Sequence, residues 1–117
     1  MKIAIIGASK DRSKYGNIIL RDLHKKGHEV FPVNPKEEEI EGIKCYISLN
    51  ELPSTIEVLN FVTPPKATLT ILKEANSLGL KNVRCQPGAS DDEVKKYLED
   101  NNFEYIVDSC IMIGPNL

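Results

Sequence analysis

The residues of this sequence best suited to bind an anion lie in the segment GASKDRSKYG, Gly7–Gly16, which follows an apolar run at the start of the chain. A strand that leads through such a loop into a helix presents free backbone N–H groups and the positive end of the helix dipole. Lys10, Arg12 and Lys14 add positive charge, which only Asp11 offsets within the loop. The pattern is typical of a phosphate-binding loop.

The glycine pattern of this loop matches a dinucleotide-binding motif only in part. Gly7 stands where a G-x-G-x-x-G motif would begin, but Ser9 takes the place of the second glycine and the next glycine is Gly16. A small side chain at position 9 still allows a phosphate to approach the backbone closely. The loop by itself leaves two interpretations open: a phosphate site, or an ordinary tight turn with solvated lysines.

The end of the second predicted strand bears on which nucleotide would fit. Dinucleotide sites usually place an Asp or Glu there, whose carboxylate bonds the ribose 2′-hydroxyl. This chain has Val33, Asn34, Pro35 and then Lys36, so the strand ends without a carboxylate and a cation follows. The pattern favours a ligand with an extra phosphate near its ribose, such as NADP or coenzyme A. A plain turn, or a carboxylate supplied by Glu37–Glu39, stays open as the alternative.

Two further loops that contain proline follow predicted strands. Val62, Thr63 and Pro64 come after a long apolar run that Asn60 interrupts. Thr63 is expected to cap the next helix, and the prolines offer a rigid apolar edge for an adenine or a pantetheine arm. Gln86 begins the segment QPGA and brings an amide group to the same edge of the predicted sheet.

These loops are positioned by apolar runs that alternate between the period of a strand and the period of a helix. The charged segment Lys36–Glu41 is expected to be a solvated loop. Helices are expected at Asn17–Lys26, from an opening at Thr63–Pro65 up to Gly79, and from a capping box at Ser90–Glu93 to about Asp100. Strands are expected at Ile3–Ile6, Glu29–Val33, within Gly42–Ser48, and at Ile56–Val62, Asn82–Cys85 and Tyr105–Ile111.

Strands that alternate with helices imply right-handed crossovers and a parallel sheet. We therefore expect an α/β fold of the three-layer, doubly wound type with a mainly parallel sheet, in which residues 1–117 form a single domain. In such sheets ligands bind beyond the carboxyl ends of the strands, where the strand order reverses. The loops described above all follow strands and should meet at that edge.

The composition excludes several classes of partner. The chain has 117 residues, of which 41% are hydrophobic and 27% charged, and its 15 basic and 17 acidic residues leave a formal net charge of -2. This balance provides no overall field for a nucleic acid or an anionic membrane. No apolar run approaches the roughly 20 residues that span a bilayer, and no signal peptide is recognised. We expect a cytoplasmic protein.

The sequence offers few candidates for catalysis. His24 and His28 are expected at the end of the sheet opposite the ligand loops, and Ser9 has no evident partners for a nucleophilic triad. The acidic run Asp91–Glu93 suits the start of a helix better than a metal site. We therefore predict no catalytic residue and no metal ligand.

The three cysteines, Cys45, Cys85 and Cys110, are far apart and odd in number, which argues against a disulfide framework or a zinc site. Cys85 and Cys110 are expected to end neighbouring strands. They are interpreted as buried core thiols. The alternative hypothesis is that one of them forms a mixed disulfide with the thiol of a bound coenzyme A.

Five short motifs occur in an order that resembles the small stand-alone CoA-binding proteins, which are similar to the CoA-binding domain of the succinyl-CoA synthetase alpha subunit. The motifs are GAS with a following KYG, then PVNP, TPP, QPGA and a late DSCIM, and they extend from Ile3 to about Ile113. The resemblance implies a Rossmann-like fold that binds coenzyme A, or an acyl-CoA, at the carboxyl edge of the sheet.

By motif match, the resemblance assigns groups of residues to parts of the ligand. The residues implied to contact the pyrophosphate are Gly7, Ala8, Ser9, Lys14, Tyr15 and Gly16. The residues implied for the 3′-phosphate end of the adenosine are Val33, Asn34, Pro35 and Lys36. Those implied for the adenine or pantetheine path are Val62, Thr63 and Pro64, and Gln86 supplies an amide nearby.

Two departures from the family pattern matter. The family often carries a Trp two positions before Gln86, where this chain has Arg84, and the chain contains no Trp. The catalytic histidine of the synthetase belongs to a further domain that this chain has no room for. The resemblance therefore implies a non-catalytic binding module, which could form a homo-oligomer through the edge strand Tyr105–Ile111. The alternatives are an NADP-binding, oxidoreductase-like domain and a scaffold for protein contacts.

Overall fold

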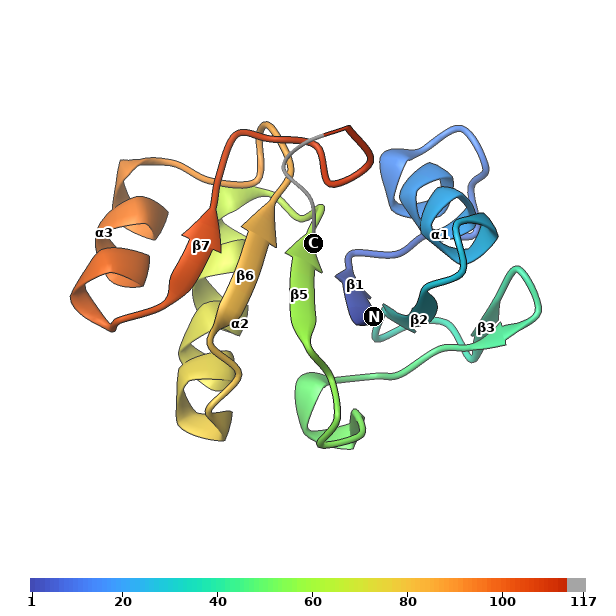
Figure 1. The fold of residues 1–117 in the computed structure, drawn as a ribbon, viewed down its shortest axis with the longest axis horizontal. Coiled ribbons are helices and arrows are strands. Elements are labelled where there is room, and N and C mark those ends of the chain that lie inside the picture. Colours follow the sequence, from blue (N-terminus) through green and yellow to red (C-terminus); the bar gives the residue numbers. More distant parts are fainter. Residues whose placement is uncertain (114–117) are drawn as a thin grey trace.

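The computed structural model describes residues 1–113, and a parallel sheet lies at its centre. Its strands are β1 (Lys2–Ile6), β2 (Glu29–Val33), β5 (Val58–Phe61), β6 (Asn82–Cys85) and β7 (Glu104–Ile106). They lie in the order β2-β1-β5-β6-β7, and every neighbouring pair is parallel (Figure 1). The central strands β1 and β5 are almost entirely buried, which is typical of parallel strands covered on both faces.

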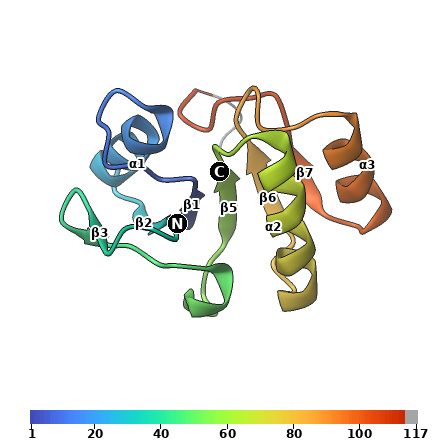
Figure 2. The same ribbon diagram turned by 180° about the vertical axis from the view of Figure 1, so that it is seen from behind.

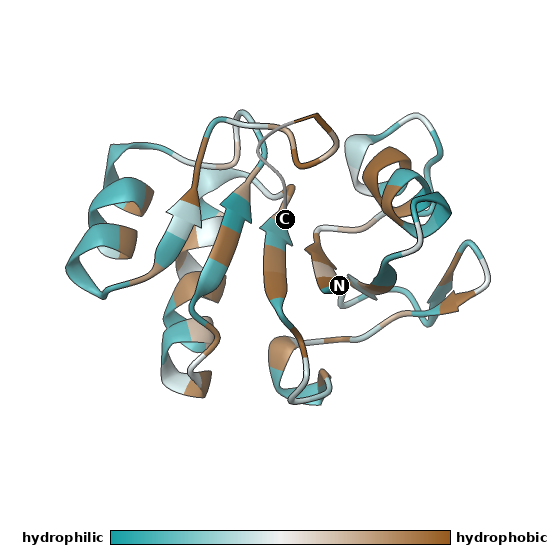
Figure 3. Ribbon diagram, in the orientation of Figure 1, coloured by the Kyte–Doolittle hydropathy of each residue, from teal (hydrophilic) through white to brown (hydrophobic). Residues whose placement is uncertain are grey.

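Helices cover the two faces of this sheet unequally. α1 (Tyr15–Lys25) packs on the side of β1 and β2, whereas α2 (Pro65–Leu78) and α3 (Asp92–Asp100) lie together on the opposite face (Figures 1 and 2). One apolar cluster joins Ile3 to α1, and a second joins Phe61 to α2 and α3. Figure 3 shows the hydrophobic residues along the strands and in stripes on the helices. The predicted three-layer α/β fold is confirmed.

The strand order reverses between β1 and β5. From β1 the chain crosses through α1 to β2 on one side, and it later continues from β5 to β6 and β7 on the other side. In doubly wound sheets a ligand binds at this reversal, outside the carboxyl ends of the strands. Gly7 and Val62, which directly follow β1 and β5, lie on either side of it.

The prediction of a solvated loop at Lys36–Glu41 is wrong in its second half, which begins an antiparallel hairpin. β3 (Glu39–Ile40) pairs there with β4 (Ile43–Lys44). Ile40 is buried in the cluster beside α1, because moving its apolar side chain out of water lowers the free energy of the folded protein. The strand predicted within Gly42–Ser48 is present as β4, but it belongs to this hairpin and not to the main sheet.

The last predicted strand, Tyr105–Ile111, is too long. β7 has only 3 residues: it ends at Ile106, which pairs with Arg84, although β6 continues to Cys85. Asp108 then adopts a φ of 56°, and Ile111 is buried against α1. Residues 107–113 therefore run from β7 toward α1 (Figure 1). The edge strand predicted for pairing with another chain is correspondingly short.

Two helix starts differ from the prediction. Pro64, not Thr63, is the N-cap residue of α2, because the ring of Pro65 disfavours helical dihedral angles at the residue before it, and Pro64 is extended. In α3 the cap is Asp91 in place of Ser90, and its carboxylate accepts a backbone N–H at 2.9 Å. A carboxylate interacts more favourably than a hydroxyl with the positive end of a helix.

Candidate functional site

Two glycines shape the loop between β1 and α1. Gly7 has a φ of +93°, which side chains rarely adopt, and its N–H donates to the carbonyl of Val33 at 3.2 Å. A Cβ on Gly16 would lie only 2.3 Å from the carbonyl oxygen of Gly7. The first turn of α1 can therefore pack directly on the backbone of the loop, which is the role of a glycine in close strand–helix packing.

The side chains of two asparagines hold the carbonyl groups of this loop. Asn34 Nδ2 donates to the carbonyl of Ala8 at 2.8 Å, and Asn17 Nδ2 donates to the carbonyl of Ser9 at 2.8 Å. All peptide bonds in residues 1–113 are trans, so the N–H of each peptide points opposite to its carbonyl. The N–H groups of Ser9 and Lys10 therefore point away from the asparagines.

The positive charge of the loop is more strongly offset than the sequence suggested. Lys10 Nζ lies 3.1 Å from a carboxylate oxygen of Glu37, and Arg12 Nε lies 3.5 Å from one of Glu41. Asp11 is the acidic residue within the loop, but the segment after β2 folds back over the loop and adds these two carboxylates. Lys14, the N-cap residue of α1, has no ion pair within residues 1–113.

A cavity of about 260 Å³ opens beside the loop at the carboxyl ends of β1, β2 and β5. Its lining is mainly apolar with few polar groups, which is typical of small-molecule sites, and its volume is slightly below the usual range of about 300–1,000 Å³. The predicted site residues that line it are Gly7, Val33, Asn34, Pro35 and Thr63. The residues that sequence reasoning missed are Ile6, Ile47, Ser48, Leu49, Ile71 and Glu74.

The remaining predicted site residues surround this region without lining the cavity. Tyr15, the first residue of α1, is 58% exposed, and Lys36 is exposed as well. The N–H of Val62 donates to the carbonyl of Ile6, which places it at the strand reversal. Gln86 follows the end of β6, the next strand of the sheet after β5. Its backbone N–H donates to the carbonyl of Phe61 at 3.0 Å.

Sequence reasoning gave no role to Asn17 and Asn60, although both are completely buried. Asn17 holds the loop as described above, and its Oδ1 accepts a bond from Arg21 Nε at 2.7 Å. Asn60 lies in the centre of β5, and neither atom of its amide has a hydrogen-bond partner. In the sequence, Asn60 could have been noticed as a polar residue inside an otherwise apolar strand, because buried polar groups need hydrogen-bond partners.

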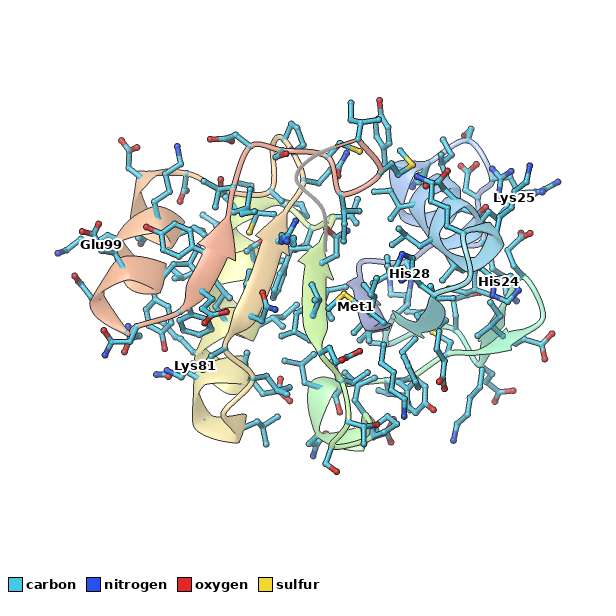
Figure 4. All side chains as sticks on the ribbon, in the orientation of Figure 1. Met1, His24, Lys25, His28, Lys81 and Glu99 are labelled. Atoms are coloured by element: carbon cyan, nitrogen blue, oxygen red, sulfur yellow. The ribbon has the colours of Figure 1, made fainter. Side chains whose placement is uncertain are left out.

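The histidines lie at the opposite end of the sheet from these loops. His28 Nδ1 is 3.1 Å from the amino group of Met1, and His24 lies in the last turn of α1 (Figure 4). Within residues 1–113, no group of histidine, cysteine and carboxylate side chains could hold a metal ion. No helix in the same range is long and apolar enough to cross a bilayer.

The cysteines differ in how accessible they are. Burial, together with the negative charge of Asp108, raises the pKa of the Cys85 thiol to about 12. Burial also raises the pKa of Cys45. Cys110 was predicted to end a strand, which is wrong: it lies in the turn region of residues 107–113 and is partly exposed. The mixed-disulfide hypothesis stays a prediction, and it now concerns Cys110.

We expect iodoacetamide at pH 8 to modify Cys110 well before Cys85 in the folded protein. A thiol with a pKa of about 12 is ionised to only about 10⁻⁴ at that pH, and the thiolate is the nucleophile. Peptide mass spectrometry after timed treatment measures both rates. Labelling of Cys85 as fast as Cys110 would contradict the burial described here, and labelling in denaturant provides the control for intrinsic reactivity.

Comparisons with known proteins point to one family. A family model described as a CoA binding domain matches residues 1–114. The alpha subunit of an ADP-forming acetate–CoA ligase II from Pyrococcus furiosus is 39% identical over 97% of this chain. An ADP-forming acetate–CoA ligase from Methanocaldococcus jannaschii is 36% identical, also over 97% of the chain.

A solved structure and the lengths of these relatives complete the comparison. A conserved hypothetical protein from Pyrococcus furiosus superposes with a TM-score of 0.93 at 53% identity, covering 96% of this chain and 97% of its own. In contrast, the chain spans only 26% of the Pyrococcus ligase subunit and 16% of the Methanocaldococcus ligase.

Proposed function

This chain belongs to the family of CoA-binding domains, and from that premise we propose that it binds coenzyme A, or an acyl-CoA, at the carboxyl edge of the sheet without catalysing a reaction. The observation that carries the proposed location is the loop of residues 7–16. Asn34 and Asn17 hold the carbonyls of Ala8 and Ser9, so the N–H groups of Ser9 and Lys10 point outward near the start of α1. A bound phosphate accepts hydrogen bonds from N–H groups arranged in this way.

In this proposal the pyrophosphate lies over the loop and the positive end of α1. Lys14 is the cation available to it, because Lys10 and Arg12 are paired with carboxylates. The residues proposed to surround the pyrophosphate are Gly7, Ala8, Ser9, Lys14, Tyr15 and Gly16.

The adenosine end of the ligand is proposed to enter the cavity beside the loop. The aliphatic and proline side chains of that cavity suit the faces of an adenine ring, and Asn34 lies at its rim. Lys36, exposed next to Pro35, would then contact the 3′-phosphate. The structure offers an ordered turn here, because Asn34 Oδ1 accepts the N–H of Lys36 at 2.8 Å.

The pantetheine arm is proposed to continue along the other side of the strand reversal. It would pass Val62, Thr63 and Pro64 and reach the amide of Gln86. The ligases among the relatives are several times longer than this chain, so their ligase activity is not part of the proposal. The whole protein's role, its location in the cytoplasm and any protein partner stay predictions.

We expect coenzyme A to raise the unfolding temperature of the protein, dephospho-CoA to raise it less, and NAD to leave it unchanged. A ligand at about 100 times its dissociation constant stabilises the native state by roughly 2.7 kcal/mol, a shift of several degrees for a domain of this size. Thermal unfolding in separate samples measures these shifts, with NADP as the discriminating fourth ligand.

The four ligands separate the competing functions. Stabilisation by NADP alone would replace the proposal with the NADP-binding, oxidoreductase-like domain. No shift with any ligand would favour a scaffold for protein contacts. Equal shifts with coenzyme A and dephospho-CoA would keep the CoA site but reject the contact between Lys36 and the 3′-phosphate.

A further inference from the structure

Two buried amide side chains at the carboxyl half of the sheet lack hydrogen-bond partners. Asn60 is completely buried, and both its Nδ2 and Oδ1 are unpaired. Gln86 is 6% exposed, and its Oε1 is buried and unpaired. Leaving such groups unpaired away from water costs about 1–3 kcal/mol each. Native proteins rarely retain unpaired buried amides without a ligand, ion or water that uses them.

These two side chains belong to the same face of the sheet. Successive side chains of a strand alternate between faces, and the neighbours Phe61 and Cys85 pack into the cluster beside α2 and α3. Asn60 and Gln86 therefore face the other way, toward the side that carries α1. The N–H of Gln86 donates to the carbonyl of Phe61, so the pairing of β5 and β6 extends to this position.

Among residues 1–113, no helix covers this part of the α1 side of the sheet. α1 packs on β1 and β2, and residues 107–113 run past the carboxyl ends of β6 and β5 toward α1 (Figure 1). That segment has no regular secondary structure. The N–H of Ser109 donates to the carbonyl of Cys85 at 3.5 Å, Lys26 Nζ donates to the carbonyl of Met112 at 3.0 Å, Lys95 Nζ pairs with Asp108 at 3.0 Å, and Ile111 is buried against α1. An irregular segment of this kind can be displaced more easily than a packed helix.

We propose that Asn60 and Gln86 form a recognition site for the amide groups of the pantetheine arm, a proposal that rests on the binding of coenzyme A argued above. The arm has two secondary amides, each with one N–H donor and one carbonyl acceptor. The unpaired atoms are two acceptors, Asn60 Oδ1 and Gln86 Oε1, and one donor group, Asn60 Nδ2. The two N–H groups match the acceptors, and a carbonyl of the arm matches the donor.

This site would give the protein a preference for pantetheine-bearing ligands over the nucleotide alone. Adenosine 3′,5′-bisphosphate has the adenine and the 3′-phosphate but no pantetheine, so its binding would not involve Asn60 or Gln86. The nucleotide contacts lie on the loops after β1 and β2, whereas these amides lie on β5 and at the end of β6. The two halves of the ligand are therefore separable by mutation.

The test is the Asn60→Leu variant, measured by calorimetry with coenzyme A and with adenosine 3′,5′-bisphosphate. Leucine is close to asparagine in size and removes the unpaired amide, so the unliganded variant should unfold at the same temperature as the wild type or higher. We expect about tenfold weaker binding of coenzyme A and unchanged binding of the bisphosphate. Gln86→Leu should act in the same direction and provides a second variant should Asn60→Leu not fold.

A matched control replaces an asparagine that has partners and lies away from this face. Asn76 on α2 donates to Tyr97 Oη at 3.2 Å, so Asn76→Leu should lower the unfolding temperature and leave both affinities unchanged. Unchanged coenzyme A binding in both Asn60→Leu and Gln86→Leu would overturn the proposal, and so would an equal loss for both ligands. Absence of coenzyme A binding to the wild-type protein would instead reject the proposed function.

Discussion

Replacing Gly16 with alanine should lower the free energy of unfolding by about 2 kcal/mol and weaken coenzyme A binding roughly tenfold or more. A loss of stability is the opposite of what helix propensity alone would give, because a helix favours alanine over glycine by up to about 1 kcal/mol. The reason is the distance of 2.3 Å between the new Cβ and the carbonyl oxygen of Gly7. This neighbour is backbone and cannot rotate away, so the loop itself must move.

Movement of the loop has a consequence for ligand binding beyond the loss of stability. The carbonyls of Ala8 and Ser9 would leave their bonds with Asn34 and Asn17, and the outward N–H groups would lose their common direction. Hydrogen bonds to a charged phosphate are worth about 1.5–3 kcal/mol each, so a single lost bond accounts for the expected weakening. Urea unfolding and calorimetric titration measure the two effects separately.

Gly27→Ala serves as the matched control. Gly27 has a φ of +94° and open space around its Cβ position, so alanine there introduces backbone strain of about 1–2 kcal/mol without a clash. It lies after α1 at the other end of the sheet, and coenzyme A affinity should stay unchanged. A Gly16→Ala protein as stable as the wild type, with full affinity, would show that the loop does not pack as described.

The second prediction concerns the two lysines assigned to different phosphates. Lys14→Ala should weaken coenzyme A and dephospho-CoA equally, by roughly 10- to 100-fold, because the pyrophosphate is common to both. Lys36→Ala should weaken coenzyme A by a similar factor and leave dephospho-CoA unchanged, because only coenzyme A carries the 3′-phosphate. Calorimetric titration gives the dissociation constant of each variant for each ligand relative to the wild type. All titrations use one salt concentration, because salt screens the interactions of exposed charges.

Lys96→Ala controls for the loss of a surface charge as such. Lys96 is on α3, away from the loops, and forms an exposed pair with Asp100. The affinities for coenzyme A and dephospho-CoA should stay within about twofold of the wild type. The stability should change little as well, because exposed ion pairs contribute little to it. If Lys36→Ala weakened both ligands equally, the 3′-phosphate would have to bind elsewhere. If Lys14→Ala had no effect, the pyrophosphate would not lie at the start of α1.

The sequence by itself determined the class of fold and the edge where the candidate site lies. The bounds predicted for the second and fifth strands, Glu29–Val33 and Asn82–Cys85, agree with the structure, and the α/β order is confirmed. These features are local: the apolar period separates a strand from a helix, and glycine or proline ends each element. Because parallel strands point the same way, their following loops must meet at one edge, whatever the order of the strands.

The tertiary structure alone decided which groups in the site are free to act. Lys10 and Lys14 look equivalent in sequence, but Glu37 folds back and pairs with only the first. β7 is short because the chain leaves β6 after Ile106 and packs Ile111 against α1, which no local pattern of residues 105–111 records. Asn60 breaks an apolar run in the sequence, but only the packed fold leaves its amide buried and unpaired. Pairing, strand length and burial depend on segments distant in sequence, and so they emerge only when the chain is packed.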